Sequence, residues 1–408
     1  MKITLLLLAL WLLAAVGPAA AQIDTTRARY YRPVFANVTV TSGVTYGSAV
    51  DYMGTMQSLQ MDIYQPAGDT VKRRPLVIFA HQGGFFLGSR TDPYMVAVCT
   101  RLARLGYVAA SIDYRLGFTA TGIASPADTV SLAQAAFRGM QDMKAVVRFF
   151  RKDAATTKTY HVHASYIVAA GSSAGAFLAL ETGYLDKASK VPDYIGLAAL
   201  GGIEGQSGTP GYSSAVLAVV NLSGATQSAS YIEAGNVPLC SVHGTRDMTV
   251  PYLQGKIGSV LPPKYVVGSG RLNPRATAVG VPNTLRPLRG AGHIPFEINA
   301  AYADTTFWTI RDFLRPLLQR PGTPLAARSA TVGPTAQAYP VPAQDAIQLV
   351  IPAAWRQLGE AQLLDMTGRV VRRLDLRTAD LRVMRGALTP GVYLLRFPGQ
   401  VPLRLVFE

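Results

Sequence analysis

The sequence of 408 residues is short of the residue types that carry several common chemistries. It has two cysteines, Cys99 and Cys240, which excludes a disulfide-rich scaffold. Each cysteine lies in an apolar segment, so we expect two buried thiols, with a disulfide as the alternative. No cysteine and histidine cluster has the spacing of a structural zinc site. His161 and His163 alternate as on a strand but lack a third ligand nearby, so we predict no metal site.

Acidic residues are also scarce, with 24 Asp and Glu against 39 Lys and Arg and a formal net charge of +15. The arginines are spread along the chain, and no nucleic-acid-binding motif accompanies them. We therefore expect no nucleic-acid partner and interpret the charge as favouring solubility and weak adhesion to anionic surfaces.

Long hydrophobic runs are absent after the first residues of the chain. Met1 and Lys2 precede an apolar run over 3–16, a Gly-Pro break and three alanines. This order predicts a secretory signal peptide over residues 1–21 and a secreted or cell-surface protein, and an uncleaved membrane anchor is the alternative. We expect no transmembrane segment in the mature protein.

One stretch organises the rest of the chain. Residues 166–170 form a short apolar run that predicts a buried strand, and helix-forming residues follow from Ala176 onward. Between them, Gly171-Ser172-Ser173-Ala174-Gly175 fits the pattern G-x-S-x-G. In a strand, tight turn and helix, this pattern exposes its central serine above the sheet, so Ser173 is the candidate nucleophile. The motif alone is short and also occurs in plain turns.

Strand-like and helical patterns alternate over most of the chain. Short apolar runs predict strands at 59–64, 75–80, 107–114, 166–170, 217–222, 237–242 and 284–288, after early antiparallel strands within 22–50. Apolar residues at helical spacing predict helices at 92–105, 127–154 and 299–319. The alternation predicts an α/β domain over residues 22–320, with a mostly parallel sheet flanked by helices. Ligands bind such sheets beyond the carboxyl ends of the strands.

A serine nucleophile needs a general base and an orienting carboxylate. With this serine turn the chain order is serine, acid, histidine, which leaves His293 as the base, just after a predicted strand. His243 precedes the best candidate acid and is excluded on that ground. That acid is Asp247, which follows the predicted strand 237–242, and Glu204 in a Gly-rich loop is the alternative.

The developing oxyanion needs backbone N–H donors. Gly83 and Gly84 follow the predicted strand 75–80 and have no side chain to obstruct the approach. With the N–H of Ala174 they would form a hole with three donors. A flexible turn is the alternative interpretation of the two glycines.

Five motifs together resemble the α/β-hydrolase superfamily, most closely its carboxylesterase and lipase members with an HGGG-type oxyanion loop. They are residues 81–85, 111–117, 171–175, 243–247 and 292–293. The resemblance covers roughly residues 30–320 and implies a triad of Ser173, Asp247 and His293 with oxyanion donors Gly83, Gly84 and Ala174. Gln82 stands where many relatives have glycine, and its amide would narrow the acyl side or bond to substrate. Asp113 and Arg115 resemble an element that supports the site.

The tail has a different pattern. Residues 321–338 lie in a Pro-, Ala- and Thr-rich stretch that predicts a linker, and short strand-like runs between turns follow over 339–408. The pattern predicts a small β-sandwich and also permits a carbohydrate-binding module. Residues 339–343, 364–370 and 388–395 resemble the C-terminal sorting domain of type IX secretion cargo. That resemblance implies the type IX machinery as a partner and no catalysis in the tail.

The sequence therefore predicts a secreted serine carboxylesterase that needs no cofactor. Its substrate would be a small-molecule or polymer-linked ester, with acetyl or feruloyl esters favoured. The alternatives are a lipase, a polyester hydrolase, a peptidase of the same fold, or a non-catalytic surface-binding protein on a hydrolase scaffold. Two Gly-rich stretches, 201–212 and 268–282, are predicted as loops, and we expect the first to line the pocket mouth or form a short cap.

Overall fold

The chain divides into two compact units. The computed structural model describes residues 23, 25, 28–119, 126–258, 263–319, 336–339, 342–378, 380–398 and 402–408. The first unit spans residues 1–327 and the second residues 328–408, and each has its own hydrophobic core. The predicted signal peptide and most of the predicted linker lie outside the described residues. None of the helices in the described ranges is long and apolar enough to cross a membrane.

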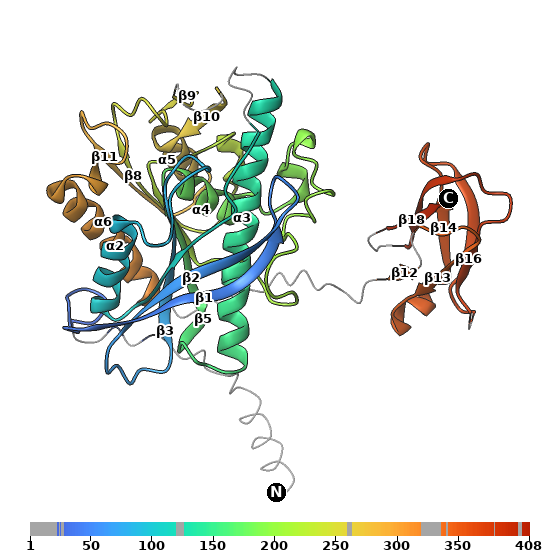
Figure 1. The fold of residues 1–408 in the computed structure, drawn as a ribbon, viewed down its shortest axis with the longest axis horizontal. Helices are drawn as coiled ribbons and strands as arrows, with labels where there is room; N and C mark the ends of the chain where they lie inside the picture. Colours follow the sequence, from blue (N-terminus) through green and yellow to red (C-terminus); the bar gives the residue numbers. More distant parts are fainter. Residues whose placement is uncertain are drawn as a thin grey trace, which may run out of the picture. The chain divides into compact units, whose positions relative to one another are not determined.

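A sheet of eight strands forms the centre of the first unit, in the order β1-β2-β4-β3-β5-β6-β8-β11 (Figure 1). The strands are β1 (Val38–Val50), β2 (Met56–Pro66), β3 (Arg74–Ala80), β4 (Val108–Ile112), β5 (Val162–Ser172), β6 (Ala218–Leu222), β8 (Leu239–Gly244) and β11 (Asn283–Leu288). β1 pairs with β2, and β2 with β4, in the antiparallel direction. All the remaining pairs of neighbouring strands, from β4 to β11 in this order, are parallel. The predicted α/β fold with a mostly parallel sheet is confirmed.

Helices cover both faces of this sheet. They are α2 (Pro93–Leu105), α3 (Pro126–Ala155), α4 (Ala174–Tyr184), α5 (Ser269–Ala278) and α6 (Ala300–Gln319). Alternate residues of β3 enter different cores: Leu76 and Ile78 pack in the cluster with α3 and α4, and Val77 in the cluster with α2 and α6. Because both faces are covered, β3 is buried along its whole length, which explains its continuous apolar sequence.

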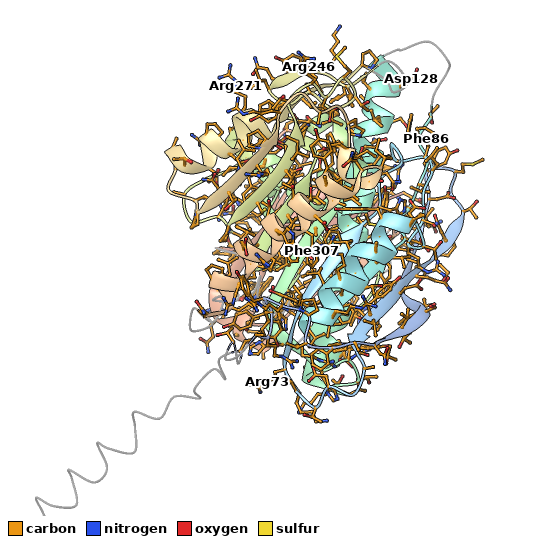
Figure 2. The ribbon with its side chains drawn as sticks, turned by 90° about the vertical axis from the view of Figure 1, so that its left-hand side faces the viewer. Arg73, Phe86, Asp128, Arg246, Arg271 and Phe307 are labelled. Carbon is orange, nitrogen blue, oxygen red and sulfur yellow. The ribbon has the colours of Figure 1, made fainter. Side chains whose placement is uncertain are left out.

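The carboxyl ends of the parallel strands lie at one edge of the sheet. The segments after β3, β5, β8 and β11 carry Gly83, Ser173, Asp247 and His293 respectively. Figure 2 shows Phe86, which follows β3, toward the same end of the unit as Arg246, which follows β8, while Arg73 before β3 lies at the opposite end. The fold therefore brings four segments that are far apart in sequence to one edge.

The prediction of a loop over 268–282 is wrong. α5 occupies Ser269–Ala278, after a small sheet of β7 (Ala225–Thr226), β9 (Gln254–Lys256) and β10 (Tyr265–Gly268). Gly270 and Pro274 suggested a break in the chain, but Pro274 lies inside the helix. Leu272 and Ala276 bury one face of α5 in the core, and this packing outweighs the weak helix propensity of the segment.

The second unit consists of two small antiparallel sheets. One contains β12 (Gln337–Tyr339), β13 (Ala346–Val350) and β16 (Arg382–Met384), and the other contains β14 (Glu360–Leu364), β15 (Val370–Asp375), β17 (Gly391–Arg396) and β18 (Leu403–Phe407). Ile347 of the first sheet and Leu363 and Leu395 of the second share one core. Gly368 at φ 85° lies in the turn of the hairpin between β14 and β15. The predicted small β-sandwich is confirmed.

Five short 3-10 helices complete the described secondary structure. They are η1 (Ala188–Lys190), η2 (Asp193–Ile195), η3 (Ala229–Tyr231), η4 (Pro295–Glu297) and η5 (Ala353–Leu358). η4 lies close to the candidate site. It begins two residues after His293, and its Glu297 accepts a hydrogen bond from the Ser172 hydroxyl in the serine turn.

Candidate active site

Ser173 lies in a strained turn between β5 and α4. Its backbone has φ 50° and ψ −117°, a conformation that residues other than glycine rarely adopt. The glycines on either side are required by close packing. A Cβ atom on Gly171 would lie 2.1 Å from the carbonyl oxygen of Gly175, and one on Gly175 would lie 2.1 Å from that of Ala80. The G-x-S-x-G sequence therefore forms the sharp turn that projects its serine beyond the strand.

The structure brings the three predicted residues Ser173, His293 and Asp247 together. Ser173 Oγ lies 2.8 Å from His293 Nε2, and His293 Nδ1 lies 2.7 Å from Asp247 Oδ2. Ser173 and Asp247 are both buried, each about 7% exposed. With Nδ1 donating to the carboxylate, Nε2 is free to accept the serine proton, which is the arrangement that a general base needs.

Asp247 is held as a charged carboxylate. Its Oδ1 accepts hydrogen bonds from the backbone N–H groups of Thr249 at 2.9 Å and Val250 at 2.8 Å. Burial alone would raise the pKa of Asp247, but hydrogen bonds from His243 and His293 outweigh burial and hold the pKa well below its ordinary value. Asp247 is therefore ionised at neutral pH and can stabilise an imidazolium at His293.

His243 is a functional neighbour that the sequence reasoning considered only as a base. It is fully buried, and its Nε2 lies 3.2 Å from Asp247 Oδ2 and 3.0 Å from the carbonyl oxygen of Val250. Both neighbours accept hydrogen bonds, so Nε2 carries the proton, and Ser269 donates to Nδ1 at 2.8 Å. His243 thus helps to fix the same carboxylate oxygen, Oδ2, that His293 contacts. Its position at the end of β8, four residues before Asp247, is the signal that could have found it.

Gly83, Gly84 and Ala174 line the same cavity as Ser173 and His293. The cavity has a volume of ≈230 Å³, and most of its remaining lining is apolar: Phe85, Phe86, Leu87, Phe177, Val250, Ile257 and Ile294. Gly83 has φ 117° and Gly84 φ 62°, both in the region that favours glycine. A Cβ on Gly83 would lie 1.9 Å from the carbonyl oxygen of Leu87, so the loop requires glycine there.

Gln82 lines this cavity beside the two glycines. Its side-chain oxygen is buried and has no hydrogen-bond partner among the described residues. An unpaired buried acceptor is unfavourable until a donor reaches it. Gln82 therefore gives the cavity wall a longer side chain than glycine would, with a buried acceptor that has no partner among the described residues.

A second carboxyl group lies next to the serine turn. Glu297 of η4 bonds to the hydroxyl of Ser172, the residue before the candidate nucleophile. Burial raises the pKa of Glu297 to about 7, and the hydrogen bond from Ser172 offsets part of that effect. Sequence reasoning missed this contact because Glu297 follows the histidine and lies outside the serine, acid, histidine order.

The alternative residues lie elsewhere. Glu204 pairs with Lys144 at 3.0 Å and Arg148 at 2.6 Å, and neither Ser173 nor His293 is among its partners. Asp113 binds Arg90, and Arg115 binds Asp142 at 2.8 Å, both as structural supports. The expectation that residues 201–212 line the pocket mouth is wrong, because none of them lines the cavity at Ser173. Ion pairs with α3 hold that loop against the helix.

Fold and site together define a serine hydrolase. A mostly parallel sheet presents a strained serine, a histidine and a buried carboxylate in hydrogen-bonded series, with glycines of a second loop beside them. Within the described ranges, no group of three or more His, Cys, Asp and Glu side chains is placed to hold a metal ion. Cys99 and Cys240 are free, buried thiols, as predicted.

Residues 61–229 match the BD-FAE family model. The matched segment contains Gly83, Gly84 and Ser173 and ends before Asp247 and His293. Together with the site geometry, this match identifies the chain as a serine esterase, a carboxylic ester hydrolase. No curated protein matches the chain.

The chain is also similar to solved esterase structures. Propionate-bound esterase 2 from the Planctomycetes species Thermogutta terrifontis is 22% identical over 70% of this chain and 96% of that chain, with a TM-score of 0.49. The same esterase phosphorylated by paraoxon gives the same identity and coverages, 22%, 70% and 96%, with a TM-score of 0.47. A truncated carbohydrate esterase from gut microbiota is 20% identical over 69% of this chain and 96% of that chain, with a TM-score of 0.47.

Proposed function

We propose that the protein is a secreted carboxylesterase that removes short-chain, acetyl or feruloyl groups through an acyl-enzyme on Ser173. The observation that supports this most strongly is the hydrogen-bonded series from Ser173 through His293 to Asp247 at the wall of an apolar cavity. The proposal extends the esterase chemistry to a substrate class and a location.

In the first half-reaction, Ser173 Oγ attacks the ester carbonyl carbon while His293 Nε2 takes the serine proton. Asp247 stabilises the imidazolium that forms. The N–H groups of Gly83, Gly84 and Ala174 donate to the oxyanion of the tetrahedral intermediate. When the intermediate collapses, the C–O bond to the alcohol breaks, and His293 returns the proton to the leaving oxygen.

In the second half-reaction, water replaces the alcohol. His293 takes a proton from the water as its oxygen attacks the acyl carbon, and the same N–H donors stabilise the second oxyanion. Collapse breaks the bond to Ser173 Oγ, which regains its proton from His293. Each proton that leaves a nucleophile is therefore returned to a leaving group, and no cofactor enters the cycle.

The size of the cavity supports a small acyl group. At ≈230 Å³ it lies below the range of roughly 300–1,000 Å³ that drug-sized ligands occupy. Its apolar wall suits an acetyl group or the ring of a feruloyl group. A lipase or polyester hydrolase is the alternative, since Phe86 and Leu87 are each about half exposed at the same cavity.

Location is part of the proposal. The predicted signal peptide over residues 1–21 supports export, and the motifs in 339–408 support passage through the type IX machinery. An exported esterase meets esters of extracellular polymers, which is why acetylated or feruloylated polysaccharides are the favoured substrates. Fractionation of expressing cells, with and without residues 339–408, tests this part, because intracellular retention of both forms contradicts it.

The test of the substrate class is a series of p-nitrophenyl esters from acetyl to palmitoyl, measured on the full chain beside Ser173→Ala. We expect serine-dependent turnover that falls as the acyl chain lengthens. Highest turnover on palmitate would favour the lipase alternative. Absence of turnover on every ester, in a folded protein, would favour the non-catalytic binding protein.

A further inference from the structure

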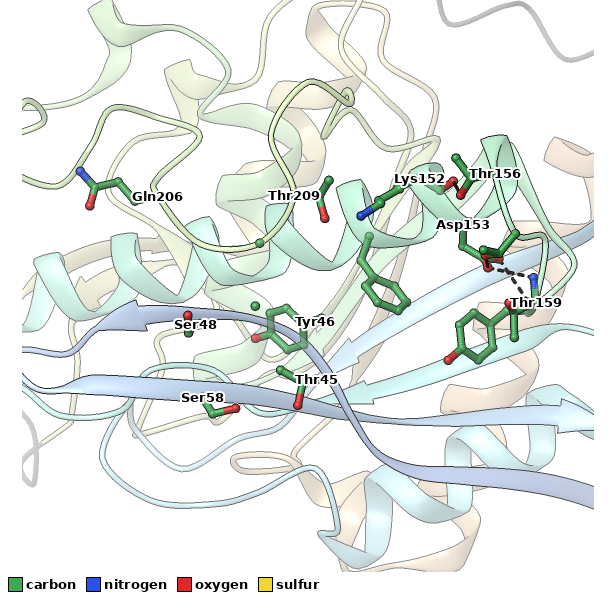
Figure 3. Close-up of a pocket in the computed structure, with 15 residues that line it drawn as sticks. Thr45, Tyr46, Ser48, Ser58, Lys152, Asp153, Thr156, Thr159, Gln206 and Thr209 are labelled. Carbon is green, nitrogen blue, oxygen red and sulfur yellow. Dashed lines mark hydrogen bonds between the residues drawn. The ribbon is translucent and has the colours of Figure 1, made fainter.

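A second and larger groove lies on the first unit, apart from the catalytic cavity. Its volume is ≈810 Å³, and the two linings share no residue. Figure 3 shows its walls: β1 and β2 on one side, the last turns of α3 on another, and the loop carrying Gln206 and Thr209 on the third. Nothing in the ester chemistry derived above uses this groove.

The α3 side of the groove lies at the end of the sheet opposite Ser173. α3 ends at Ala155, and the chain then enters β5 at Val162. Lys152, Asp153 and Thr156–Tyr160 therefore stand at the amino end of β5, whereas Ser173 follows its carboxyl end. A molecule in the groove would not occupy the acyl cavity, because the two linings share no residue.

Contacts made by the buried side chain of Arg148 hold the loop wall of the groove in place. Arg148 Nη1 lies 2.6 Å from Glu204 Oε2, Nη2 donates to the carbonyl oxygen of Ser207 at 2.7 Å, and Nε donates to that of Thr209 at 3.1 Å. Arg148 is only about 4% exposed, so the guanidinium is held inside the protein while Glu204 remains half exposed. The wall is fixed before any ligand arrives, which lowers the entropic cost of binding.

The α3 wall is fixed in a similar way. Asp153 accepts hydrogen bonds from the Thr157 hydroxyl at 2.7 Å and the Thr159 N–H at 2.8 Å, which closes the turn after the helix. Half-buried Phe149 and Tyr160 lie in this wall with ring centroids 6.0 Å apart. Their partly exposed rings give the groove apolar faces of the kind on which sugar rings stack.

On one side of the groove, the backbone of β1 at Gly47 lies very close to the backbone of the loop at Gly208. A Cβ atom on Gly47 would lie 2.6 Å from the backbone nitrogen of Gly208. β1 also has register shifts between Thr41 and Val44 and between Thr45 and Gly47, and such irregularities re-aim side chains next to binding sites. Glycine at position 47 and the irregular strand together form the bottom of the groove.

Several exposed polar side chains that line the groove form no side-chain hydrogen bond within the part of the chain that the structure describes. Thr45, Ser48 and Ser58 are exposed hydroxyl residues, and none has a side-chain hydrogen bond to another described residue. The same is true of the Lys152 ammonium. Hydroxyl groups beside aromatic faces match a polyhydroxylated ligand, which offers both donors and apolar ring faces.

We propose that this groove is a secondary binding site for a neutral polysaccharide segment. Its volume lies in the range of roughly 300–1,000 Å³ found for ligand sites. The lining contains one cation, Lys152, and the carboxylate of Asp153, so it lacks the cluster of positive charge that a nucleic acid requires. Hydroxyls interrupt its apolar surface, which disfavours a lipid chain. That the bound polymer also carries the cleaved ester rests on the proposed function.

The binding experiment uses the full chain with Ser173→Ala, so that hydrolysis does not alter the probe. Affinity gel electrophoresis with soluble arabinoxylan or glucomannan measures binding directly. The test variant adds Thr45→Ala and Ser48→Ala, which remove two exposed hydroxyl groups of the lining without touching the core. The matched control adds Thr41→Ala and Gln57→Ala, polar residues of β1 and β2 that do not line the groove.

We expect at least one polysaccharide to retard the protein, and the test variant to bind it about tenfold more weakly than the control. With Ser173 present, the same test substitutions leave hydrolysis of p-nitrophenyl acetate unchanged. Lack of retardation by both polysaccharides, or equal binding by test and control variants, overturns the proposal. Neither result bears on the esterase, whose failure would appear with p-nitrophenyl acetate.

Discussion

Ser173 is held in a conformation that its own backbone disfavours. A non-glycine residue at φ 50° persists only when its surroundings determine it, and here β5, α4 and the two flanking glycines do so. This conformation projects the Ser173 hydroxyl beyond the strand, toward His293. The strained backbone and the close packing around it therefore place the Ser173 hydroxyl where it can attack a substrate. There it also forms the hydrogen bond of 2.8 Å to His293.

The orientation of His293 depends on Asp247. We expect Asp247→Asn to lower kcat by roughly 10³–10⁴-fold with little change in KM, because the amide favours the wrong tautomer of the imidazole. Steady-state kinetics on p-nitrophenyl acetate measures this. Glu204→Gln, at the alternative acid, is the control and should leave kcat unchanged. The reverse pattern would mean that the acid has been assigned wrongly.

Glu181 on α4 makes stability depend on pH. Burial raises its pKa to about 8, and its Oε2 has no partner among the described residues. The folded state then holds a proton that the unfolded state releases near its ordinary pKa of 4.5. Its contribution to stability is complete below that value and is lost as pH rises through about 8.

Glu181→Gln should therefore remove part of the fall in stability that the wild type shows as pH rises. Urea unfolding at several values between pH 5 and pH 8.5 should show the variant gaining on the wild type as pH rises. Activity on p-nitrophenyl acetate is the control, since Glu181 does not line the catalytic cavity. A constant difference between the two proteins across this range would contradict a raised pKa.

The close contact between β3, β5 and α4 determines the conformation of the turn that holds Ser173. The helix can begin directly after the strand only because Gly175 passes close to Ala80. We expect Gly175→Ala to lower the free energy of unfolding by about 3 kcal/mol or more, since its Cβ would meet backbone that cannot move aside.

Denaturant unfolding of Gly175→Ala beside Gly292→Ala tests this. Gly292 has open space around a Cβ atom, so its variant should be unchanged or stabilised by up to about 1 kcal/mol. Equal stability of the two variants would show that the close approach at Gly175 is not required.

The elements that could be predicted are those whose sequence pattern reports burial directly. β3 and β5 each contain a continuous apolar run, 75–80 and 166–170, because both faces of the sheet are covered there, and α3 has regular apolar spacing because its apolar residues pack in the core. α5 was missed because its helix depends on tertiary packing against its weak propensity. The loop 201–212 was misplaced because Arg148, distant in sequence, determines where it lies.

The same distinction holds for the site. Chain order and strand ends were enough to select Ser173, Asp247 and His293, and the structure brings these three together. The support from His243 and the contact of Glu297 with Ser172 required the folded geometry. Long-range contacts between polar residues leave no periodic signal in the sequence.

At the scale of the whole molecule, the two units have separate cores. Every group described at the active site and at the groove belongs to residues 1–327. We therefore expect removal of residues 328–408 to leave kcat and KM for p-nitrophenyl acetate within roughly twofold of the full chain. Circular dichroism of the shortened protein provides the folding control. A large fall in kcat with native secondary structure would mean that the second unit contributes to catalysis.

We expect Ser173 to be the nucleophile of this serine esterase. The most direct measurement is mass spectrometry of the full chain after incubation with a p-nitrophenyl phosphonate, which reacts with activated serines. We expect one label per chain, on the peptide that contains Ser173, with loss of hydrolysis in proportion to labelling. A label on another residue, or full hydrolysis by a protein labelled at Ser173, would contradict it.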